Sequence, residues 1–281
     1  MLRRVILCIA ALASSSAVSA PHDTSPAKVP ADQSFVLPLA RGELTQLEAS
    51  AAAGDVRSQL RLGNVYYFGV GIAQDFALAE QWYRKAAGEG SAQAQTNLGE
   101  MFDKGKGVAQ DDTEALRWYR MAAEKGHPRA QYAVGTFFGE GRGVPVNERQ
   151  AVEWYSRAAK QNYVRAQFNL ANMLADGRGI PKNEKEAVRL YRLAARGGYP
   201  EAQFNLGLMY ANGHGVPADD GMAYMWMAVV QMGKDFLQPG AEQALRVLTS
   251  RMDSDAVGRA RSAAEKCEAS RFQACQSSSR F

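Results

Sequence analysis

Residues 91–126 read SAQAQTNLGEMFDKGKGVAQDDTEALRWYRMAAEKG, and related stretches of 36 residues precede and follow this one. One glutamine and two glycines return at the same positions in every stretch. Repeats of this length are typical of proteins in which each unit buries its apolar face against its neighbours. The columns are Gln59, Gln95, Gln131, Gln167 and Gln203; Gly69, Gly105, Gly141, Gly177 and Gly213; and Gly71, Gly107, Gly143, Gly179 and Gly215. The predicted units are 55–90, 91–126, 127–162, 163–198 and 199–234.

Within one unit the apolar residues follow a helical period. Ala94, Leu98 and Phe102 fall on one helical face, and a Gly-x-Gly turn ends that helix. A residue that favours helix N-caps then precedes a second helix, which ends at glycine or asparagine. The sequence therefore predicts an all-α solenoid of five helix–turn–helix repeats. The predicted N-caps are Asp75, Asp111, Asn147, Asn183 and Asp219.

All four tryptophans also share one register, and Leu190 fills the position that they skip in the fourth unit. Two interpretations are open: core packing between helices, or a ladder of rings that stacks on a ligand. We favour packing, with each indole N–H bonded to a neighbouring turn, because a buried tryptophan usually finds such a partner. The register consists of Trp82, Trp118, Trp154 and Trp226.

The ends of the repeat array differ from its middle, as the capping of a solenoid requires. Residues 41–54 have the pattern of a second helix, which predicts an N-terminal capping half-repeat. Residues 235–275 predict C-terminal capping helices at 243–252 and 256–268. The methionine-rich segment 222–232 is expected to lie beneath them.

The first twenty residues predict a signal peptide. A basic start at Arg3 and Arg4, an apolar stretch and a small-residue motif ending at Ala20 are typical of export signals. We expect cleavage after Ala20 and a periplasmic or secreted protein. Residues 21–40 contain four prolines and no helical period, which predicts a disordered tether, and residues 276–281 are expected to be a frayed tail.

Composition excludes several functional classes. The formal charge of +4 falls to about +2 without Arg3 and Arg4, so no strong basic bias indicates nucleic acid. No later stretch reaches the roughly 20 apolar residues of a transmembrane helix. We expect a monomer that binds neither nucleic acid nor a cofactor.

Two cysteines remain after the predicted cleavage, Cys267 and Cys275, and an even count in an oxidising compartment favours a disulfide. A continuous helix would separate their Cα atoms by about 12 Å, whereas a disulfide needs about 5.5–6 Å. A bridge therefore requires the helix to break between them, near Ser270. Two free thiols are the alternative.

The repeat can be written A-Q-x-x-L-G-x-x-Y/F-x-x-G-x-G-V-x-x-[DN]-x-x-x-A-x-x-W-Y-x-x-A-A-x-x-G. This pattern resembles the Sel-one-like repeat family, which is related to tetratricopeptide repeats. The resemblance implies a right-handed superhelix whose members act as adaptors for other proteins, often in exported or membrane-associated assemblies. A cysteine-rich branch linked to β-lactam binding and hydrolysis carries a disulfide in each repeat, which this chain lacks.

The expected function is therefore an exported scaffold or adaptor that binds protein or peptide partners in the periplasm or envelope. Two alternatives remain: a hydrolase of cell-wall or β-lactam substrates, and a secreted effector that contacts host proteins. No metal-ligand spacing, nucleophile elbow or phosphate-binding loop is present, so we assign no catalytic, cofactor or metal residue.

Two columns are candidate binding sites. The first lies on the first helices, away from the face that carries Leu98 and Gly99. Asparagine there could bind the backbone of an extended peptide; helix-pair packing is its alternative. It consists of Arg61, Asn97, Ala133, Asn169 and Asn205.

The second column lies between the paired glycines and is a candidate basic edge for an acidic partner or an anionic glycan. Its alternative is a set of solvated turns, because charges about a Debye length apart reinforce one another weakly. It consists of Lys106, Arg142, Arg178 and His214, with Val70 in the first unit.

Overall fold

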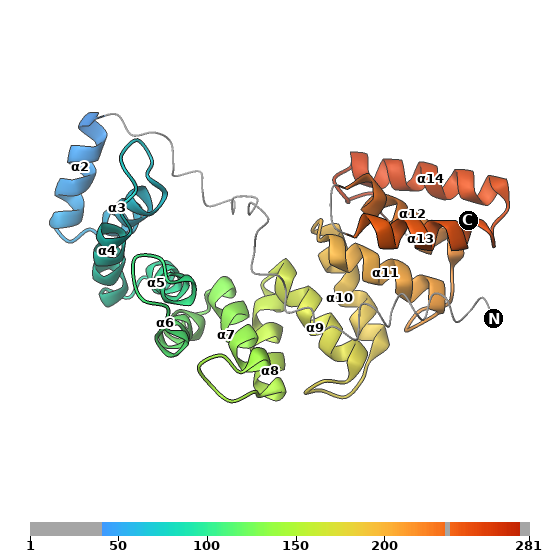
Figure 1. Cartoon of the computed structure of the whole chain (residues 1–281), viewed down its shortest axis with the longest axis horizontal. Coiled ribbons are helices and arrows are strands. Elements are labelled where there is room, and N and C mark those ends of the chain that lie inside the picture. Colours follow the sequence, from blue (N-terminus) through green and yellow to red (C-terminus); the bar gives the residue numbers. More distant parts are fainter. Residues whose placement is uncertain (1–40, 234–236, 276–281) are drawn as a thin grey trace. The chain divides into compact units, whose positions relative to one another are not determined.

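The computed structural model describes residues 41–233 and 237–275, which contain thirteen helices and no strand (Figure 1). The predicted signal peptide, tether and tail lie outside these residues. The chain divides into two compact units between Gln161 and Asn162. We call the described parts the N-terminal unit (41–161) and the C-terminal unit (162–275).

The N-terminal unit comprises the capping half-repeat and the first three repeats. Helices that follow one another in the sequence pack together, from α2 against α3 to α7 against α8. Leu47 and Ala51 of the first helix are buried against Leu62 and Val65 of the next, as expected of a cap. The helices are α2 (Arg41–Ala52), α3 (Val56–Phe68), α4 (Phe76–Gly88), α5 (Ala92–Lys104), α6 (Asp112–Glu124), α7 (Pro128–Glu140) and α8 (Glu148–Lys160).

The C-terminal unit contains the last two repeats and the closing helices. The methionine-rich helix α12 packs against both α13 and α14, as predicted, although Met232 at its end is exposed. The first closing helix begins at Gln238, five residues before the predicted start. The helices are α9 (Val164–Asp176), α10 (Glu184–Arg196), α11 (Pro200–Asn212), α12 (Asp220–Met232), α13 (Gln238–Thr249) and α14 (Ser254–Ala269).

The predicted helix boundaries are confirmed by their caps. All five predicted N-cap side chains accept a backbone N–H in the first turn of their helix. Every first helix of a repeat ends at a glycine with positive φ. Asn162 adopts a positive φ of 62°, as predicted where asparagine replaces glycine.

The second glycine of each turn lies against the preceding repeat. A Cβ built on Gly107 would lie 2.5 Å from Cβ of Phe76, and one on Gly143 would lie 2.7 Å from the carbonyl oxygen of Asp112. Both contacts are at the start of the preceding second helix. This column therefore needs glycine for two reasons, a positive φ and close backbone packing.

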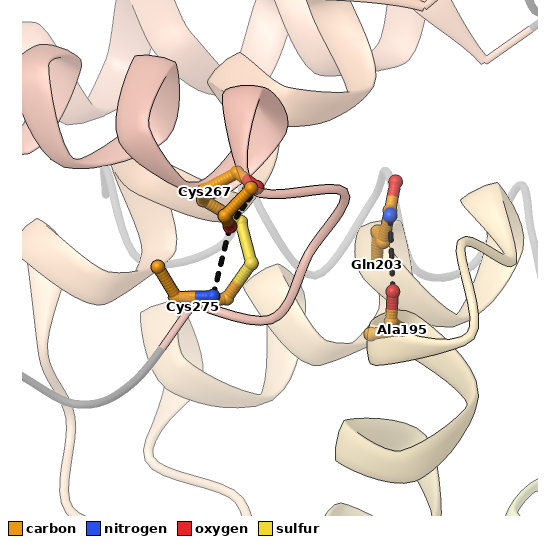
Figure 2. Close-up of a disulfide and its surroundings, with 6 residues drawn as sticks. Ala195, Gln203, Cys267 and Cys275 are labelled. Atoms are coloured by element: carbon orange, nitrogen blue, oxygen red, sulfur yellow. Dashed lines mark hydrogen bonds between the residues drawn. A yellow bond between two sulfur atoms is a disulfide. The ribbon is translucent and has the colours of Figure 1, made fainter.

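The glutamine column ties each first helix to the end of the preceding second helix. Gln95 Nε2 donates to the carbonyl of Ala87 at 3.1 Å, and Gln203 Nε2 donates to that of Ala195 at 3.1 Å (Figure 2). The carbonyls in the last turn of a helix lack intrahelical partners, so these bonds satisfy groups that need one. The same bond joins Gln59 to Ala51 and Gln131 to Ala123.

A disulfide closes the C-terminal unit. Cys267 lies in the last turn of α14 and is joined to Cys275 in the loop that follows, with a Cα–Cα distance of 4.7 Å (Figure 2). The helix ends at Ala269 with Ser270 as its cap, at the predicted break. Phe272 in the loop has a positive φ of 68° and packs against Gly198.

The tryptophan register is only partly core. Trp118 and Trp226 are buried, whereas Trp82 and Trp154 are half-buried beneath cationic side chains, with Lys85 Nζ 3.9 Å from the Trp82 ring centroid. The predicted indole hydrogen bonds are wrong for the buried pair. Among the described residues, Nε1 of Trp118 and Nε1 of Trp226 have no partner.

Candidate functional site

The first helices carry a ladder of hydrogen bonds between consecutive repeats. Tyr83, on the second helix of the first repeat, donates its hydroxyl to Asn64 Oδ1 at 2.7 Å. Asn97, one repeat later, donates Nδ2 to the same oxygen at 3.2 Å. Burial raises the pKa of Tyr83, which keeps its phenol protonated as a donor. Asn64 thus joins two helices of one repeat to the next repeat.

The same three residue types recur in the C-terminal unit. Tyr191 donates its hydroxyl to Asn172 Oδ1 at 2.6 Å, and Asn205 Nδ2 lies 3.4 Å from the same oxygen. Each of these residues lies three repeats after its counterpart in the N-terminal unit. We call both sets the Tyr–Asn–Asn ladder. The fold uses it twice, once in each unit.

The ladder leaves part of its hydrogen-bonding capacity unused. Asn97 donates one N–H to Asn64 and accepts Gln93 Nε2 at Oδ1, 2.9 Å away. The Asn97 amide nitrogen also donates toward the Tyr83 hydroxyl, a bond that opposes the rise in the tyrosine pKa. A primary amide carbonyl has two lone pairs, so one acceptor position remains on Asn97. Asn97 is half-buried. Its amide is therefore oriented by the fold and still able to bind a ligand.

The other polar members of this first-helix column differ in their hydrogen bonding. Arg61 Nε is buried and has no hydrogen-bond partner in the part of the chain that the structure describes. Asn169 is half-buried in α9, and Asn205 is engaged through its amide nitrogen alone. Both Asn97 and Asn205 therefore have structural roles, as the packing interpretation of this column requires, in addition to any role in binding.

Sequence reasoning missed Asn64, Asn172 and the tyrosine hydroxyls. Asparagine at position 64 reappears at 172 but is replaced by Glu100 and Thr136 in the intervening repeats. A search for columns that are constant in every repeat cannot find it. A comparison of first and fourth repeats alone would have shown the pair.

Charged residues continue the first-helix surface across the second and third repeats. Glu100 of α5 forms ion pairs with Arg129 of α7 and with Lys104, whose Nζ lies 2.7 Å away. Burial alone would raise the pKa of Glu100, but the positive charges of Arg129 and Lys104 outweigh it and lower the pKa. We define the first-helix face of the N-terminal unit as Arg61, Asn64, Phe68, Asn97, Glu100 and Arg129.

The predicted basic edge does not form a stripe of unpaired charges in the N-terminal unit. Arg142 pairs with Asp103 and Asp112 of the preceding repeat, and the hydrogen bonds to them raise its pKa although burial opposes the shift. Lys106 Nζ lies 5.3 Å from the ring centroid of Tyr67. Both side chains contact the preceding repeat. The Gly-x-Gly turn that carries them lies against that repeat, because its second glycine packs closely there.

The other two members of this column lie in the C-terminal unit. Arg178 and His214 are exposed. The turn around His214 borders an open depression of about 870 Å³ that also carries Lys182, Glu184 and Lys185. Its charges are mixed, and Lys182 Nζ lies 2.8 Å from a carboxylate oxygen of Glu184.

A family model decides the identity of the repeats. The Sel1 repeat model matches five consecutive segments, 56–91, 92–127, 128–163, 164–199 and 200–228. The chain belongs to the Sel1 repeat family. Sel1 repeats form a protein-interaction scaffold that is typically not catalytic.

Solved structures resemble this Sel1 repeat protein. A Sel1 repeat protein from Oxalobacter formigenes is 31% identical with a TM-score of 0.69, over 80% of this chain and 93% of that one. A protective antigen of uropathogenic Escherichia coli with an SLR fold is 27% identical with a TM-score of 0.56. That match covers 82% of this chain and 57% of the antigen. No curated protein matches the sequence significantly.

Within 41–233 and 237–275, no helix combines the length and apolar character that a membrane span requires. The same residues contain no group of three or more histidine, cysteine, aspartate or glutamate side chains arranged to hold a metal ion.

Proposed function

We propose that this Sel1 repeat protein is an exported, non-enzymatic adaptor that binds an extended segment of a protein partner on its first-helix face. The setting we propose is the periplasm or the cell envelope. The observation that carries the proposal is the unused hydrogen-bonding capacity of the ladder. Asn97 keeps one acceptor position while the fold orients its amide, and no hydrogen bond from the neighbouring Arg61 guanidinium is recorded among the described residues.

This arrangement suits a peptide backbone. A backbone presents alternating N–H and C=O groups. The Asn97 carbonyl can accept from an N–H, and the Arg61 guanidinium can donate to a C=O. Binding through the backbone requires no particular partner sequence, so pockets or charges beside the amide must supply specificity. Glu100, Arg129 and the exposed ring of Phe68 lie on the same first-helix face and could supply it.

The export part of the proposal rests on the sequence of residues 1–20. Expression of the full chain in a bacterial host, followed by cell fractionation and intact-mass measurement, tests it. We expect a periplasmic or secreted product that begins at Pro21. An uncleaved cytoplasmic product would contradict export while leaving the binding surface untouched.

The binding part is tested by capture from envelope extract with mass spectrometry, using variants that spare the fold. Arg61→Met and Phe68→Ala remove side chains of this face without deleting any hydrogen bond recorded between described residues, and Phe68 is 47% exposed, so we expect weaker capture at an unchanged melting temperature. Gln81→Ala, at an exposed position of a second helix, is the control. Equal capture by all four proteins would contradict the proposal. Turnover of a chromogenic β-lactam without captured protein would favour the hydrolase instead.

A further inference from the structure

A small cavity of about 130 Å³ lies in the C-terminal unit beside the disulfide loop. Since each water molecule takes about 30 Å³ in the liquid, the cavity has room for about four waters or for one small ligand group. Its lining comes from three consecutive helices and the loop. These residues are Arg192 and Arg196 of α10, Tyr210 of α11, Met222 and Trp226 of α12, and Cys275.

The polar side chains of this lining are hydrogen-bond donors. Arg192 uses two N–H groups on the Tyr210 hydroxyl, from Nε at 3.2 Å and Nη2 at 2.7 Å, and a guanidinium has three more. The Tyr210 oxygen accepts both bonds, so its own O–H remains to donate. Trp226 is only 1% exposed, and its N–H has no partner among the described residues. The indole N–H has almost no accessible surface, so the Trp226 ring lines the cavity but this donor does not face it.

The cavity also carries positive charge that the fold does not neutralise. Neither Arg192 nor Arg196 forms an ion pair with a carboxylate of the described residues, although Arg189 on the same helix pairs with Glu186. Arginine forks match planar oxyanions in geometry as well as in charge. Two guanidiniums without a carboxylate partner and a phenol O–H together favour an anionic acceptor.

We infer that this cavity is a binding site for a carboxylate group carried on a short apolar stem. Met222, the indole ring and the disulfide provide apolar contacts for the stem, while the donors of Arg192, Arg196 and Tyr210 bind the carboxylate. An inorganic phosphate offers no apolar surface to these contacts. Two sources fit the same chemistry: a small organic acid, and the free carboxyl terminus of a peptide.

The experiment is a titration of the oxidised mature protein, followed by NMR of the indole N–H groups. Four tryptophans give four indole resonances, and Trp226→Phe identifies the relevant one by its absence. We expect propionate to shift the Trp226 resonance in a saturable manner and propionamide, its neutral counterpart, to leave it in place. A tripeptide with a free carboxyl terminus, compared with its amidated form, distinguishes the peptide source from the small-acid source.

Three variants separate binding from folding. Arg192→Gln is expected to weaken propionate binding about tenfold or more, the scale of a lost charge-assisted hydrogen bond. Arg196→Gln, measured by calorimetry, is expected to weaken it as well, and it deletes no hydrogen bond recorded between described residues. Arg189→Gln, on the exposed face of the same helix, is expected to retain wild-type affinity.

The inference is overturned by any of three results. These are an unshifted Trp226 resonance with propionate and with the free-terminus peptide, unchanged affinity in Arg192→Gln, and tighter binding of inorganic phosphate than of propionate. The first would mean that water alone fills the cavity. The variants leave the first-helix face intact, so failure here would not count against the adaptor proposal.

Discussion

The ring of Tyr119 in α6 lies against the backbone of Gly99 in α5, so a Cβ added at Gly99 would lie 2.6 Å from the tyrosine Cδ1. Tyr83 and Tyr155 approach Gly63 and Gly135 in the same way. The helix pairs of the N-terminal unit can therefore pack at this distance only with glycine. The repeated glycine in the first helix is therefore a packing requirement.

We predict that Gly99→Ala destabilises the protein by about 1–3 kcal/mol, the usual cost of overpacking a core. Alanine gains about 1 kcal/mol in helix propensity, which is too little to offset the clash. Chemical denaturation followed by circular dichroism measures the change. The matched control is Gly258→Ala in α14, where an added Cβ meets nothing within 4 Å. We expect it to stabilise the protein by about 1 kcal/mol.

Gln95→Ala is predicted to cost about 2 kcal/mol. It deletes the bond to the Ala87 carbonyl and leaves a cavity where a side chain is only 1% exposed. Gln81→Ala, at an exposed position, is expected to change the free energy of unfolding by less than about 0.5 kcal/mol. Similar losses in both variants would mean that the glutamine column does not join the repeats.

The Glu100 ion pairs predict a pH dependence. Because Arg129 and Lys104 lower the pKa of Glu100 in the folded state, their contribution is present above the unfolded pKa of about 4.3 and is lost as pH falls through the folded value. Glu100→Gln should therefore destabilise the protein by about 1 kcal/mol near pH 7. The difference from wild type should shrink as the pH falls below about 4. A difference that is constant from pH 7 to 3 would contradict this assignment.

The disulfide is predicted to stabilise the C-terminal unit. Replacement of both cysteines, Cys267→Ser with Cys275→Ser, removes the closure of a loop with a sequence separation of 8. The expected loss is about 2–3 kcal/mol. In hydrogen exchange, the amides of α14 should lose more protection than those of α9, because the bridge is anchored in the last turn of α14. Equal protection of α14 in both proteins would show that helix packing alone closes the unit.

Period and local chemistry were sufficient to predict most of the fold. The caps at Asp75 and Asp111, the turn at Gly105 and Gly107 and the break near Ser270 all depend on residues a few positions apart, where backbone rules apply directly. The start of α13 at Gln238 was missed because the period stops before it.

The candidate site was less predictable, because it depends on contacts between repeats. The column containing Asn97 was identified, but its bond to Asn64 crosses 33 residues of sequence. The pairing of Arg142 with Asp103 and Asp112 is likewise a contact between repeats, and it neutralises a charge that the sequence alone presents as available. Trp226 illustrates the same limit, since only the structure shows that its N–H is buried without a partner.

The central claim is that a protein partner binds the first-helix face, and photocrosslinking in cells tests it most directly. Phe68, 47% exposed on α3, and Met121, 36% exposed on the second helix α6, can each be replaced by the photoreactive benzoylphenylalanine. Phe68 lies one helical turn after Asn64 on the same face. We predict light-dependent adducts with a discrete protein from position 68 and none from position 121. Adducts from position 121 alone, or from neither position while the protein is folded and exported, would contradict the account.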